Sequence, residues 1–473
     1  MTAPLTAEPT LFPPDFVWGV ATAAFQIEGA ASEGGKGESI WDEFCRRPGA
    51  IADGSNGLVA CDHVHRLQGD LDLIQSLGVD AYRFSVSWPR VRPGGSGAWS
   101  EAGLDFYERL VDGLLARGVA PYLTLNHWDL PLELQASGGW AHRDTVHRFV
   151  EYAQGMARRL GDRVRAITTH NEPWVMAMLG HETGIFAPGI KSRAVASQVS
   201  HHLLLSHGLA LQALRAGGCK ADLGIVLNLS PIHPATNSAA DRAQARLEDG
   251  RLIRWYMDPL FKGSYPDDVL AFLGADAPRV EAGDMQTIHT SMDFLGLNYY
   301  SRTVASAGTP WDVHSSGRAV TEMGWEVYPE GLTELLLRLQ RDYAVPPLFV
   351  TENGGAFKDQ IVHGADGSPQ VHDIDRRDYI ARHIDAVADA MRQGVRMGGY
   401  MVWSLMDNFE WASGYAKRFG IVHVDYASQT RTVKDSAHWY RDFVARQKAV
   451  RVAHNPQQQA MAPDWAKQAE VTR

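Results

Sequence analysis

Ala166-Ile-Thr-Thr-His-Asn-Glu-Pro-Trp174 is a short β-type run that ends abruptly in polar residues. Asn171 and Glu172 close the run, and the proline that follows prevents its continuation as a strand. Leu348-Phe-Val-Thr-Glu-Asn-Gly354 has the same form, with Glu352 at the end of an apolar run and a turn after it. Two glutamates at the tips of two strands, far apart in the sequence, predict paired-carboxylate chemistry.

Strand-like runs of this kind alternate with helical patterns along the chain. The eight strand candidates are residues 16–29, 81–88, 121–128, 166–172, 223–230, 292–300, 348–352 and 397–405. The helical patterns are residues 63–77, 102–117, 143–160, 195–216, 239–255, 331–343, 377–393 and 435–448. The strand runs are apolar rather than alternating, which fits burial on both faces of a parallel sheet. A count of eight predicts an α/β fold, a closed (β/α)8 TIM barrel.

A doubly wound open sheet is the main alternative, and it is weakened because no strand candidate is followed by Gly-x-Gly-x-x-Gly. The sequence shows no internal repeat, no low-complexity linker and no break in composition, so we expect one domain over residues 1–473. Its core is predicted at about residues 12–450, with tails at 1–11 and 453–473. The C-terminal tail is expected to be loosely held. Long βα loops are expected at about 30–57, 183–194, 301–330, 354–376 and 406–420.

The composition argues against several classes of partner. The chain has 45 Lys and Arg against 55 Asp and Glu, a formal net charge of −10, which disfavours nucleic acid and anionic membranes. No window approaches about 18 consecutive apolar residues, and residues 1–15 do not resemble a signal peptide. Cys45, Cys61 and Cys219 show neither disulfide-framework nor metal-ligand spacing, so we expect a reducing, cytoplasmic location. Homo-oligomerisation is left open.

The carboxyl ends of the strand candidates carry carboxylates, amides and indoles. In a barrel these ends build the site. In chain order they supply Gln26, Glu28, Arg83, His127-Trp128-Asp129, Asn171-Glu172, Asn228, Asn298, Tyr300, Glu352 and Trp403, and the last loop adds Asp407, Glu410 and Trp411. This mixture suits a polyhydroxylated ligand, because amides and carboxylates bind hydroxyls and indole faces stack on sugar rings. Core packing is the simpler explanation for most of the 14 tryptophans.

Six carboxylates lie near strand tips: Glu28, Asp129, Glu172, Glu352, Asp407 and Glu410. Any of them can be structural, paired with arginine or capping a loop. We favour Glu172 and Glu352, because each directly ends a strand and is therefore held on a rigid element. Paired carboxylates suit glycoside hydrolysis, in which one protonates the departing oxygen and the other attacks the sugar or activates water, depending on their separation.

Seven motifs in order resemble glycoside hydrolase family 1, the β-glucosidase family, over about residues 12–450. They are Phe16-Val-Trp-Gly-Val-Ala-Thr-Ala-Ala-Phe-Gln-Ile-Glu-Gly29, Tyr82-Arg-Phe-Ser-Val-Ser-Trp-Pro-Arg90, His127-Trp-Asp-Leu-Pro131, Thr169-His-Asn-Glu-Pro173, Asn298-Tyr-Tyr300, Thr351-Glu-Asn-Gly354 and Trp403-Ser-Leu-Met-Asp-Asn-Phe-Glu-Trp411.

The resemblance implies a retaining mechanism, with Glu352 as the nucleophile and Glu172 as the acid and then the base. It implies that Arg83 and Tyr300 are the charge and hydrogen-bond partners of the nucleophile. The substrate-binding residues that it implies fall into groups: Asn171 for the 2-hydroxyl; Gln26, His127, Glu410 and Trp411 for the 3-, 4- and 6-hydroxyls; Trp403 as the stacking floor, closed by Phe419; and Trp174 and Trp325 on the aglycone side. Trp128 and Asn298 are assigned to the same substrate-binding set.

These assignments predict an exo-acting β-glucosidase that releases β-linked glucose, and also galactose or fucose, from short oligosaccharides and aryl or alkyl glycosides. Neither a cofactor nor a metal is implied. The resemblance also narrows the substrate. Position 172 is Glu and not the Gln of the family's thioglucosidases, so it implies O-glycosides. Glu410 stands where the family's phospho-β-glycosidases typically carry a smaller residue such as Ser, and its carboxylate would repel a 6-phosphate. The rivals are a broad-specificity β-galactosidase or β-fucosidase, a transglycosylase, and a catalytically silent sugar-binding protein. The last is disfavoured by the presence of both glutamates.

Three histidines outside this set are not assigned to the site. His170 stands between Thr169 and Asn171, where many members of the family carry an apolar residue, and we expect a satisfied core histidine. His201 and His202 are expected to make surface or packing contacts.

Overall fold

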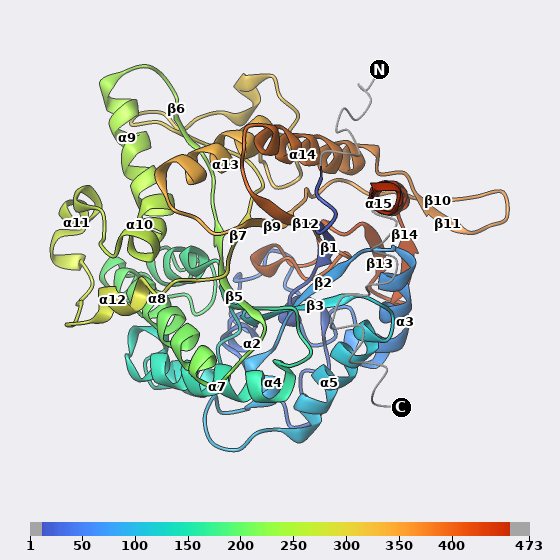
Figure 1. Ribbon diagram of the computed structural model, residues 1–473, viewed down its shortest axis with the longest axis horizontal. Coiled ribbons are helices and arrows are strands. Elements are labelled where there is room, and N and C mark those ends of the chain that lie inside the picture. The colour runs from blue at the N-terminus through green and yellow to red at the C-terminus, as the bar shows by residue number, and fades with distance from the viewer. Residues whose placement is uncertain (1–11, 455–473) are drawn as a thin grey trace.

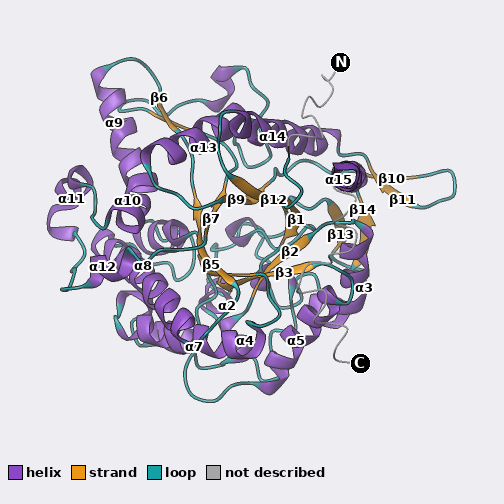
Figure 2. Cartoon of the chain, in the orientation of Figure 1, coloured by secondary structure: helices purple, strands orange, loops and turns teal. Residues whose placement is uncertain are grey.

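Eight parallel strands close into a barrel at the centre of the molecule, and helices surround it (Figures 1 and 2). The computed structural model describes residues 12–454. The barrel strands are β1 (Val17–Ala21), β2 (Ala81–Ser85), β3 (Ala120–Asn126), β4 (Ala166–Asn171), β5 (Asp222–Asn228), β7 (Phe294–Asn298), β9 (Leu348–Asn353) and β12 (Met397–Trp403). Each matches one of the predicted runs to within one residue or lies inside it, so the predicted TIM barrel is confirmed.

The longer helices surround the barrel (Figure 1). They are α3 (His63–Ser76), α5 (Glu101–Leu115), α7 (Asp144–Leu160), α8 (Arg193–Ala216), α9 (Ala239–Asp249), α10 (Trp255–Lys262), α13 (Glu330–Asp342), α14 (Ile374–Arg392) and α15 (Asp435–His454). In α13 the buried leucines are Leu332, Leu335, Leu336 and Leu339, which recur at the three- and four-residue spacing of one helix face. Burial of such stripes supplies most of the free energy that holds the helices in place.

Shorter elements occupy the long loops. They are the helices α1 (Ala24–Ile27), α2 (Ile40–Cys45), α4 (Trp88–Val91), α6 (Leu132–Ala136), α11 (Asp267–Leu273) and α12 (Asp284–Ile288), and the strands β6 (Ile232–Pro234), β8 (Thr303–Ala305), β10 (Ile361–His363), β11 (Pro369–Val371), β13 (Val422–Asp425) and β14 (Thr430–Val433). Strands β10 and β11 form a hairpin that projects from the body of the molecule (Figure 1).

The prediction of a strand over 16–29 is wrong beyond Ala21, because residues 24–27 form α1. The hydroxyl of Ser85 accepts a hydrogen bond from the Ala24 amide at 2.8 Å, which satisfies a free N–H at the start of this helix. The predicted helix 239–255 is helical throughout, and the π-helical residues Gly250–Arg254 (η3) join α9 to α10. The hairpin β13–β14 is absent from the prediction. The predicted tails, apart from residues 453 and 454, lie outside the described residues.

Both strands that carry the predicted glutamates contain an irregularity beside the glutamate. Between β4 and β5, the pair Thr168–Gly224 is followed by Asn171–Val226, which places one extra residue on β4. Between β7 and β9, one extra residue likewise lies on β9 just before Glu352. Such β-bulges turn the strand locally and redirect the side chains that follow. The bulges therefore help to aim both carboxylates.

A small separate core is made entirely of residues from barrel strands: Ala81, Ala120, Tyr122, Ala166, Phe294 and Met401. This is the pattern of side chains that fill a barrel interior. Arg83 lies two residues after Ala81 on β2, so its side chain points to the same face one layer higher. The packed interior thereby forms a floor beneath a buried arginine.

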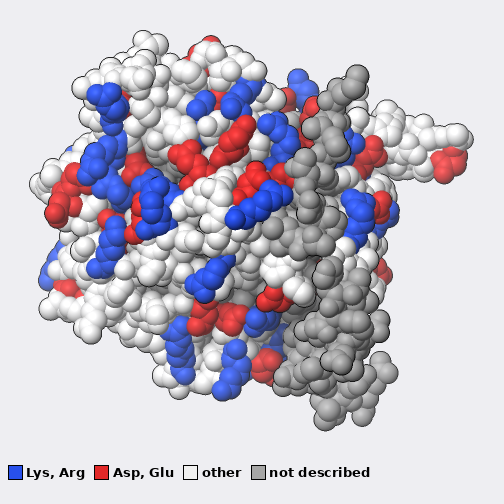
Figure 3. Space-filling view, turned by 45° about the horizontal axis from the view of Figure 1, so that its top comes forward, with Lys and Arg blue, Asp and Glu red and all other residues white. Residues whose placement is uncertain are grey.

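The surface carries charges of both signs. Figure 3 shows Lys and Arg side chains interspersed with Asp and Glu side chains over the face drawn. Among the described residues, no helix has the length and apolar character needed to cross a membrane.

Candidate active site

A cavity of about 600 Å³ opens at the carboxyl ends of the barrel strands. Twelve of the predicted site residues line it: His127, Trp128, Glu172, Trp174, Asn298, Tyr300, Trp325, Glu352, Trp403, Glu410, Trp411 and Phe419. The other three, Gln26, Arg83 and Asn171, are buried immediately behind the wall and are hydrogen-bonded to residues that line it. The structure therefore brings the whole predicted set together.

The six candidate carboxylates separate into two groups. Glu172, Glu352 and Glu410 line the cavity, whereas Glu28, Asp129 and Asp407 do not. Glu28 accepts a hydrogen bond of 2.7 Å from Arg90 and another from the Tyr107 hydroxyl, so it is a structural ion pair. Burial raises the pKa of Asp129 well above its usual value, which favours the neutral form of this side chain. Asp407 is held by buried cations, as described below.

Glu352 is held by a cation and a hydroxyl. Arg83 Nη1 donates to Oε1 at 2.6 Å, and the Tyr300 hydroxyl donates to Oε2 at 2.6 Å. Burial raises the pKa of Glu352, and Arg83 and Tyr300 oppose that rise. Both donors favour the ionised form of the carboxylate, which is the form a nucleophile requires.

Glu172 has a different environment. Its Oε1 accepts one hydrogen bond, from Asn298 Nδ2 at 2.6 Å. Burial, together with the nearby charge of Glu352, raises the pKa of Glu172 to about 8. The residue has φ of 48°, in the left-handed region, where β4 turns into the helical segment η2 (Val175–Glu182). Glu172 is therefore the carboxyl group that holds its proton near neutral pH, whereas the donors around Glu352 favour its ionised form.

Hydrogen bonds fix the orientation of the side-chain amides between the two glutamates. Asn171 Oδ1 accepts from Arg83 Nη2 at 2.6 Å and from Asn298 Nδ2 at 3.0 Å. The Nδ2 group of Asn171 therefore faces His127 and donates to its Nε2 at 3.1 Å. Because that ring nitrogen accepts, the hydrogen of the neutral imidazole is on Nδ1. Burial lowers the pKa of His127 well below its usual value, so the ring is neutral.

Two of the buried polar atoms that lack a partner among the described residues belong to the predicted sugar-binding set and suit a ligand that carries hydroxyl groups. They are Nδ1 of His127 and Oε1 of Gln26. The amide of Gln26 is oriented because its Nε2 donates to Asn408 Oδ1 and the Phe409 carbonyl, both at 2.9 Å, and reaches Glu410 Oε2 at 3.5 Å. A donor and an acceptor are thus presented from fixed positions.

Glu410 is the third carboxyl group in the cavity. Burial and the charge of Glu352 raise its pKa to about 8, and the contact with Gln26 opposes the rise. A neutral carboxyl group can both donate and accept, which suits a pair of hydroxyls.

Aromatic side chains form the walls. The ring of Trp403 stacks on His127, with 5.9 Å between centroids and 17° between planes, and the Trp128 and Trp411 centroids are 4.5 Å apart. In a second group Trp325 lies 5.4 Å from Tyr300 and 6.2 Å from Phe419, between centroids. These rings supply flat apolar faces to the cavity that the carboxylates line.

The outer part of the cavity contains residues that the sequence did not identify. They include Met178, Leu179, Phe186, Gln244, Glu248, Arg251, Arg302 and Met323. Asn228, which was named above at a strand end, also lines the cavity. These residues lie on loops and on the helical elements after β4 and β5, without a motif. The prediction of long βα loops gave only a weak indication of these lining residues, because binding residues often lie on loops.

The histidines assigned to packing are buried. His170 Nε2 is 2.8 Å from the Ser206 hydroxyl and its Nδ1 is 3.0 Å from Asn126 Nδ2, so it is a satisfied core histidine, as expected. His201 and His202 are also buried, bonded to Asp284 and to the Trp140 carbonyl. The packing alternative was therefore right for this pair, and the surface alternative was wrong.

The sequence profile of glycosyl hydrolase family 1 matches residues 8–449. Beta-glucosidase A of Acetivibrio thermocellus is 46% identical, over 92% of this chain and 98% of that protein. A bifunctional beta-D-glucosidase/beta-D-fucosidase of Bifidobacterium breve is 44% identical, over 92% and 98%. The structure of a beta-glucosidase from Thermotoga maritima in complex with deoxynojirimycin superimposes with a TM-score of 0.87 at 43% identity, covering 92% of this chain and 99% of that one. The chain therefore belongs to glycosyl hydrolase family 1.

Proposed function

We propose that the protein is a retaining exo-β-glucosidase that hydrolyses terminal β-D-glucosyl residues of oligosaccharides and of aryl or alkyl β-glucosides. The observation that carries the proposal is the contrast between the two glutamates. Glu352 is bonded to a guanidinium and a phenol, whereas Glu172 is bonded to an amide and has a pKa of about 8. Two carboxyl groups in opposite protonation states are what a double displacement needs.

In the first step, the Glu352 carboxylate attacks the anomeric carbon while Glu172 gives its proton to the departing oxygen. A covalent glycosyl–enzyme forms and the aglycone leaves. In the second step, Glu172, now ionised, removes a proton from water, and the resulting nucleophile displaces Glu352 from the anomeric carbon. Arg83 and Tyr300 stabilise the Glu352 carboxylate before attack and again when it departs.

The sugar is recognised by the oriented polar groups and the indoles. Asn171, fixed by Arg83 and Asn298, is placed for the 2-hydroxyl. The unpartnered Nδ1 of His127 and Oε1 of Gln26, together with Glu410, serve the 3-, 4- and 6-hydroxyls. Trp403 provides the floor, and Phe419 closes the sugar site. Trp174 and Trp325 form the aglycone side.

A second activity, on β-fucosides, has support from the Bifidobacterium breve relative, a bifunctional beta-D-glucosidase/beta-D-fucosidase, and activity on β-galactosides is proposed beside it. A panel of kcat/KM values on 4-nitrophenyl glucoside, galactoside and fucoside ranks these activities.

The proposal includes a single catalytic unit and a cytoplasmic location. All three cysteines are free, which agrees with a reducing compartment.

Proton NMR of the first-formed sugar tests the proposed function. With 4-nitrophenyl β-D-glucopyranoside as the substrate, the β-anomer of glucose is expected first, because two displacements restore the configuration. If α-glucose forms first, the proposed roles of the two glutamates are wrong. If no glycoside is turned over, the sugar-binding alternative replaces the enzyme.

A further inference from the structure

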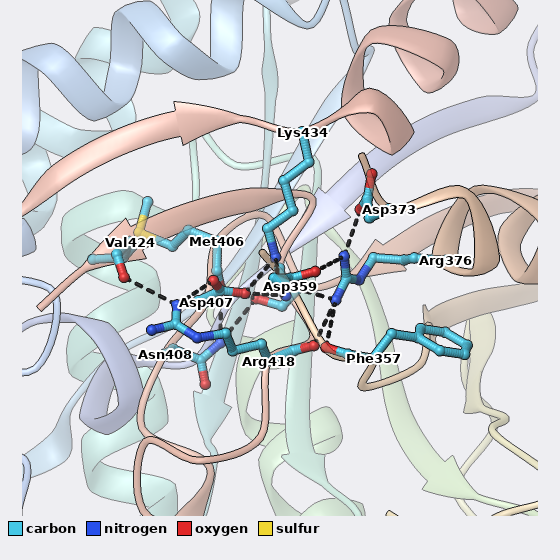
Figure 4. Close-up of polar contacts among 12 residues, drawn as sticks. Phe357, Asp359, Asp373, Arg376, Met406, Asp407, Asn408, Arg418, Val424 and Lys434 are labelled. Carbon is cyan, nitrogen blue, oxygen red and sulfur yellow. Dashed lines mark hydrogen bonds and ion pairs between the residues drawn. The ribbon is translucent and has the colours of Figure 1, made fainter. Parts of the chain in front are cut away.

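A buried network of charges adjoins the segments that carry Glu410 and Phe419, and Figure 4 shows the contacts within the network. The charge network consists of Asp359, Asp373, Arg376, Asp407, Arg418 and Lys434. Three carboxylates face three cations, so the formal charges cancel. The side chain of Arg418 is 23% exposed, and those of the other five are 0% exposed.

Asp407 is at the centre of the network. Its Oδ1 accepts from Lys434 Nζ at 2.8 Å and from the Gly420 amide at 3.0 Å, and its Oδ2 accepts from Arg418 Nη1 at 2.6 Å. Although burial raises the pKa of Asp407, the cations Lys434, Arg418 and Arg376 hold it below its usual value. The side chain is therefore an ionised carboxylate with both oxygens bonded.

Asp407 connects two sugar-facing segments. Glu410 follows it by three residues, and Gly420, whose amide it binds, follows Phe419 directly. A Cβ atom on Gly420 would lie 2.0 Å from the Asp407 amide nitrogen, so the two backbones are in contact there. The next residue, Asn408, accepts the hydrogen bond that orients Gln26. A displacement of Asp407 would therefore reach three groups of the sugar site.

The other members anchor Asp407 to the rest of the barrel. Lys434 Nζ, on the loop after β14, also binds Asp359 Oδ2 at 2.5 Å, on the segment that follows β9 and its Glu352. Arg376 on α14 binds Asp359 Oδ1 at 2.9 Å and Asp373 Oδ2 at 2.5 Å, and its Nη2 donates to the Arg418 carbonyl at 2.8 Å. These charged groups, together with a backbone hydrogen bond from the Phe357 amide to the Arg418 carbonyl at 3.3 Å, fix the loop after β12 relative to the segment after β9.

Stability alone is a weak explanation for this arrangement. Buried ion pairs carry a desolvation cost that often equals their mutual attraction, and apolar replacements can be equally stable. The ion pairs also fix the orientation of the groups that they join, because each charged group forms hydrogen bonds in only a few geometries. The network adjoins the segments of Glu410 and Phe419, so these are the segments whose orientation it fixes.

We propose that the charge network, through Asp407, holds Glu410 and Phe419 in register with the sugar, and that Asp407 is a positioning residue for recognition of the 6-hydroxyl. This inference rests on the proposed function, which places Glu410 against the hydroxyls of glucose. A misplaced Glu410 weakens binding of substrates that carry a 6-hydroxyl more than binding of substrates that lack it.

Two substrates that differ in one group test the proposal: 4-nitrophenyl β-D-glucopyranoside and its 6-deoxy analogue. We define the selectivity as the ratio of kcat/KM for the glucoside to kcat/KM for the 6-deoxy analogue. A hydrogen bond to a carboxyl group gives the wild-type enzyme a selectivity of about 10-fold or more. In Asp407→Asn the selectivity is expected to fall about 5-fold or more, and in Arg418→Gln, at the exposed edge of the network, about 2- to 3-fold.

Asp284→Asn is the matched control. Asp284 is a buried carboxylate bonded to Arg143 and His201, and it does not line the cavity. This variant is expected to lose thermal stability, measured as Tm, while its selectivity stays at the wild-type value. If Asp407→Asn does not fold, Arg418→Gln alone decides the outcome.

Glu410→Ala distinguishes failure of the positioning role of Asp407 from failure of the assignment of Glu410 to the sugar. A selectivity near one in Glu410→Ala and the wild-type value in both network variants would overturn the positioning role and leave the proposed function intact. A wild-type selectivity retained in Glu410→Ala would contradict the assignment of Glu410 to the sugar, and with it this inference. Equal losses of selectivity in Asp284→Asn and Asp407→Asn would show a general effect of destabilisation and would also overturn the proposal.

Discussion

Arg83 and Glu352 are joined by a buried hydrogen bond of 2.6 Å between Nη1 and Oε1. Arg83 extends from the barrel interior and also holds Asn171, so a single cation orients the proposed nucleophile and the amide assigned to the 2-hydroxyl. Glu172, whose proton the mechanism requires, accepts its hydrogen bond from the neutral amide of Asn298. The division of roles between the two glutamates therefore has its physical origin in their bonding partners.

Tyr300→Phe tests the support given to Glu352. Loss of the hydroxyl removes a hydrogen bond that favours the carboxylate, so the pKa of Glu352 rises. The acid limb of the pH profile of kcat/KM is expected to move to higher pH by about one unit, and kcat to fall about 10- to 100-fold. Tyr299→Phe is the control, because the Tyr299 hydroxyl binds the Tyr328 carbonyl instead of a carboxylate. An unmoved acid limb in Tyr300→Phe would count against the assigned role.

Glu172→Gln tests the proton donor. In the wild-type enzyme kcat/KM is expected to fall as the pH rises through about 8, because the acid loses its proton there. The variant should lose this alkaline limb, and kcat/KM on phenyl β-glucoside should fall about 10²- to 10⁴-fold. On 2,4-dinitrophenyl β-glucoside the fall should be much smaller, since that leaving group needs no proton. Equal losses on both substrates would argue that Glu172 is not the acid.

Trp174→Ala tests the aglycone side of the cavity. Removal of the indole takes away a flat apolar surface for an aryl aglycone, so kcat/KM for 4-nitrophenyl β-glucoside is expected to fall about 10-fold. Methyl β-glucoside, whose aglycone is one carbon, serves as the control substrate and should change less than about 3-fold. A similar loss on both glucosides would place Trp174 in the sugar site instead.

Gly354→Ala tests the packing behind the nucleophile. A Cβ atom at this position would lie 1.7 Å from the Trp403 carbonyl oxygen, so β9 and β12 must separate to accept it. The variant is expected to lose about 1–3 kcal/mol of unfolding free energy in urea titrations, and activity with it. Gly69→Ala is the control: a Cβ there, within α3, meets nothing within 4 Å, and it should raise stability by about 0.5–1 kcal/mol. Full stability in Gly354→Ala would show that the contact yields at little cost.

The barrel and the pair of glutamates could be predicted because both depend on local patterns. A strand buried on both faces is a continuous apolar run, and the polar residue that ends it marks the functional edge of the sheet. Glu172 and Glu352 each satisfy this rule. Gln26 does not: it was predicted near a strand end but lies on α1, since an apolar run reads the same in a buried helix as in a buried strand.

The outer cavity and the charge network could not be predicted in this way. Gln244, Glu248 and Arg251 have the polar character of an exposed helix, and their place in the cavity depends on how a long connection folds back over the barrel. Asp407 was noted as one of six carboxylates, but its buried partner Lys434 lies 27 residues away in the sequence and also binds Asp359. The pKa of Glu172 likewise depends on burial and on Glu352, which are tertiary properties.

Glu352→Gly with added azide tests most directly the proposal that Glu352 attacks the anomeric carbon. The variant should not hydrolyse 4-nitrophenyl β-glucoside, because the attacking group is gone. Azide in the space left by the side chain should restore release of nitrophenol and give α-glucosyl azide, identified by NMR, through a single displacement. Glu182→Gln, a carboxylate variant at the outer edge of the cavity, should show no azide-dependent product. Near-wild-type hydrolysis by Glu352→Gly, or β-glucosyl azide as its product, would contradict the account.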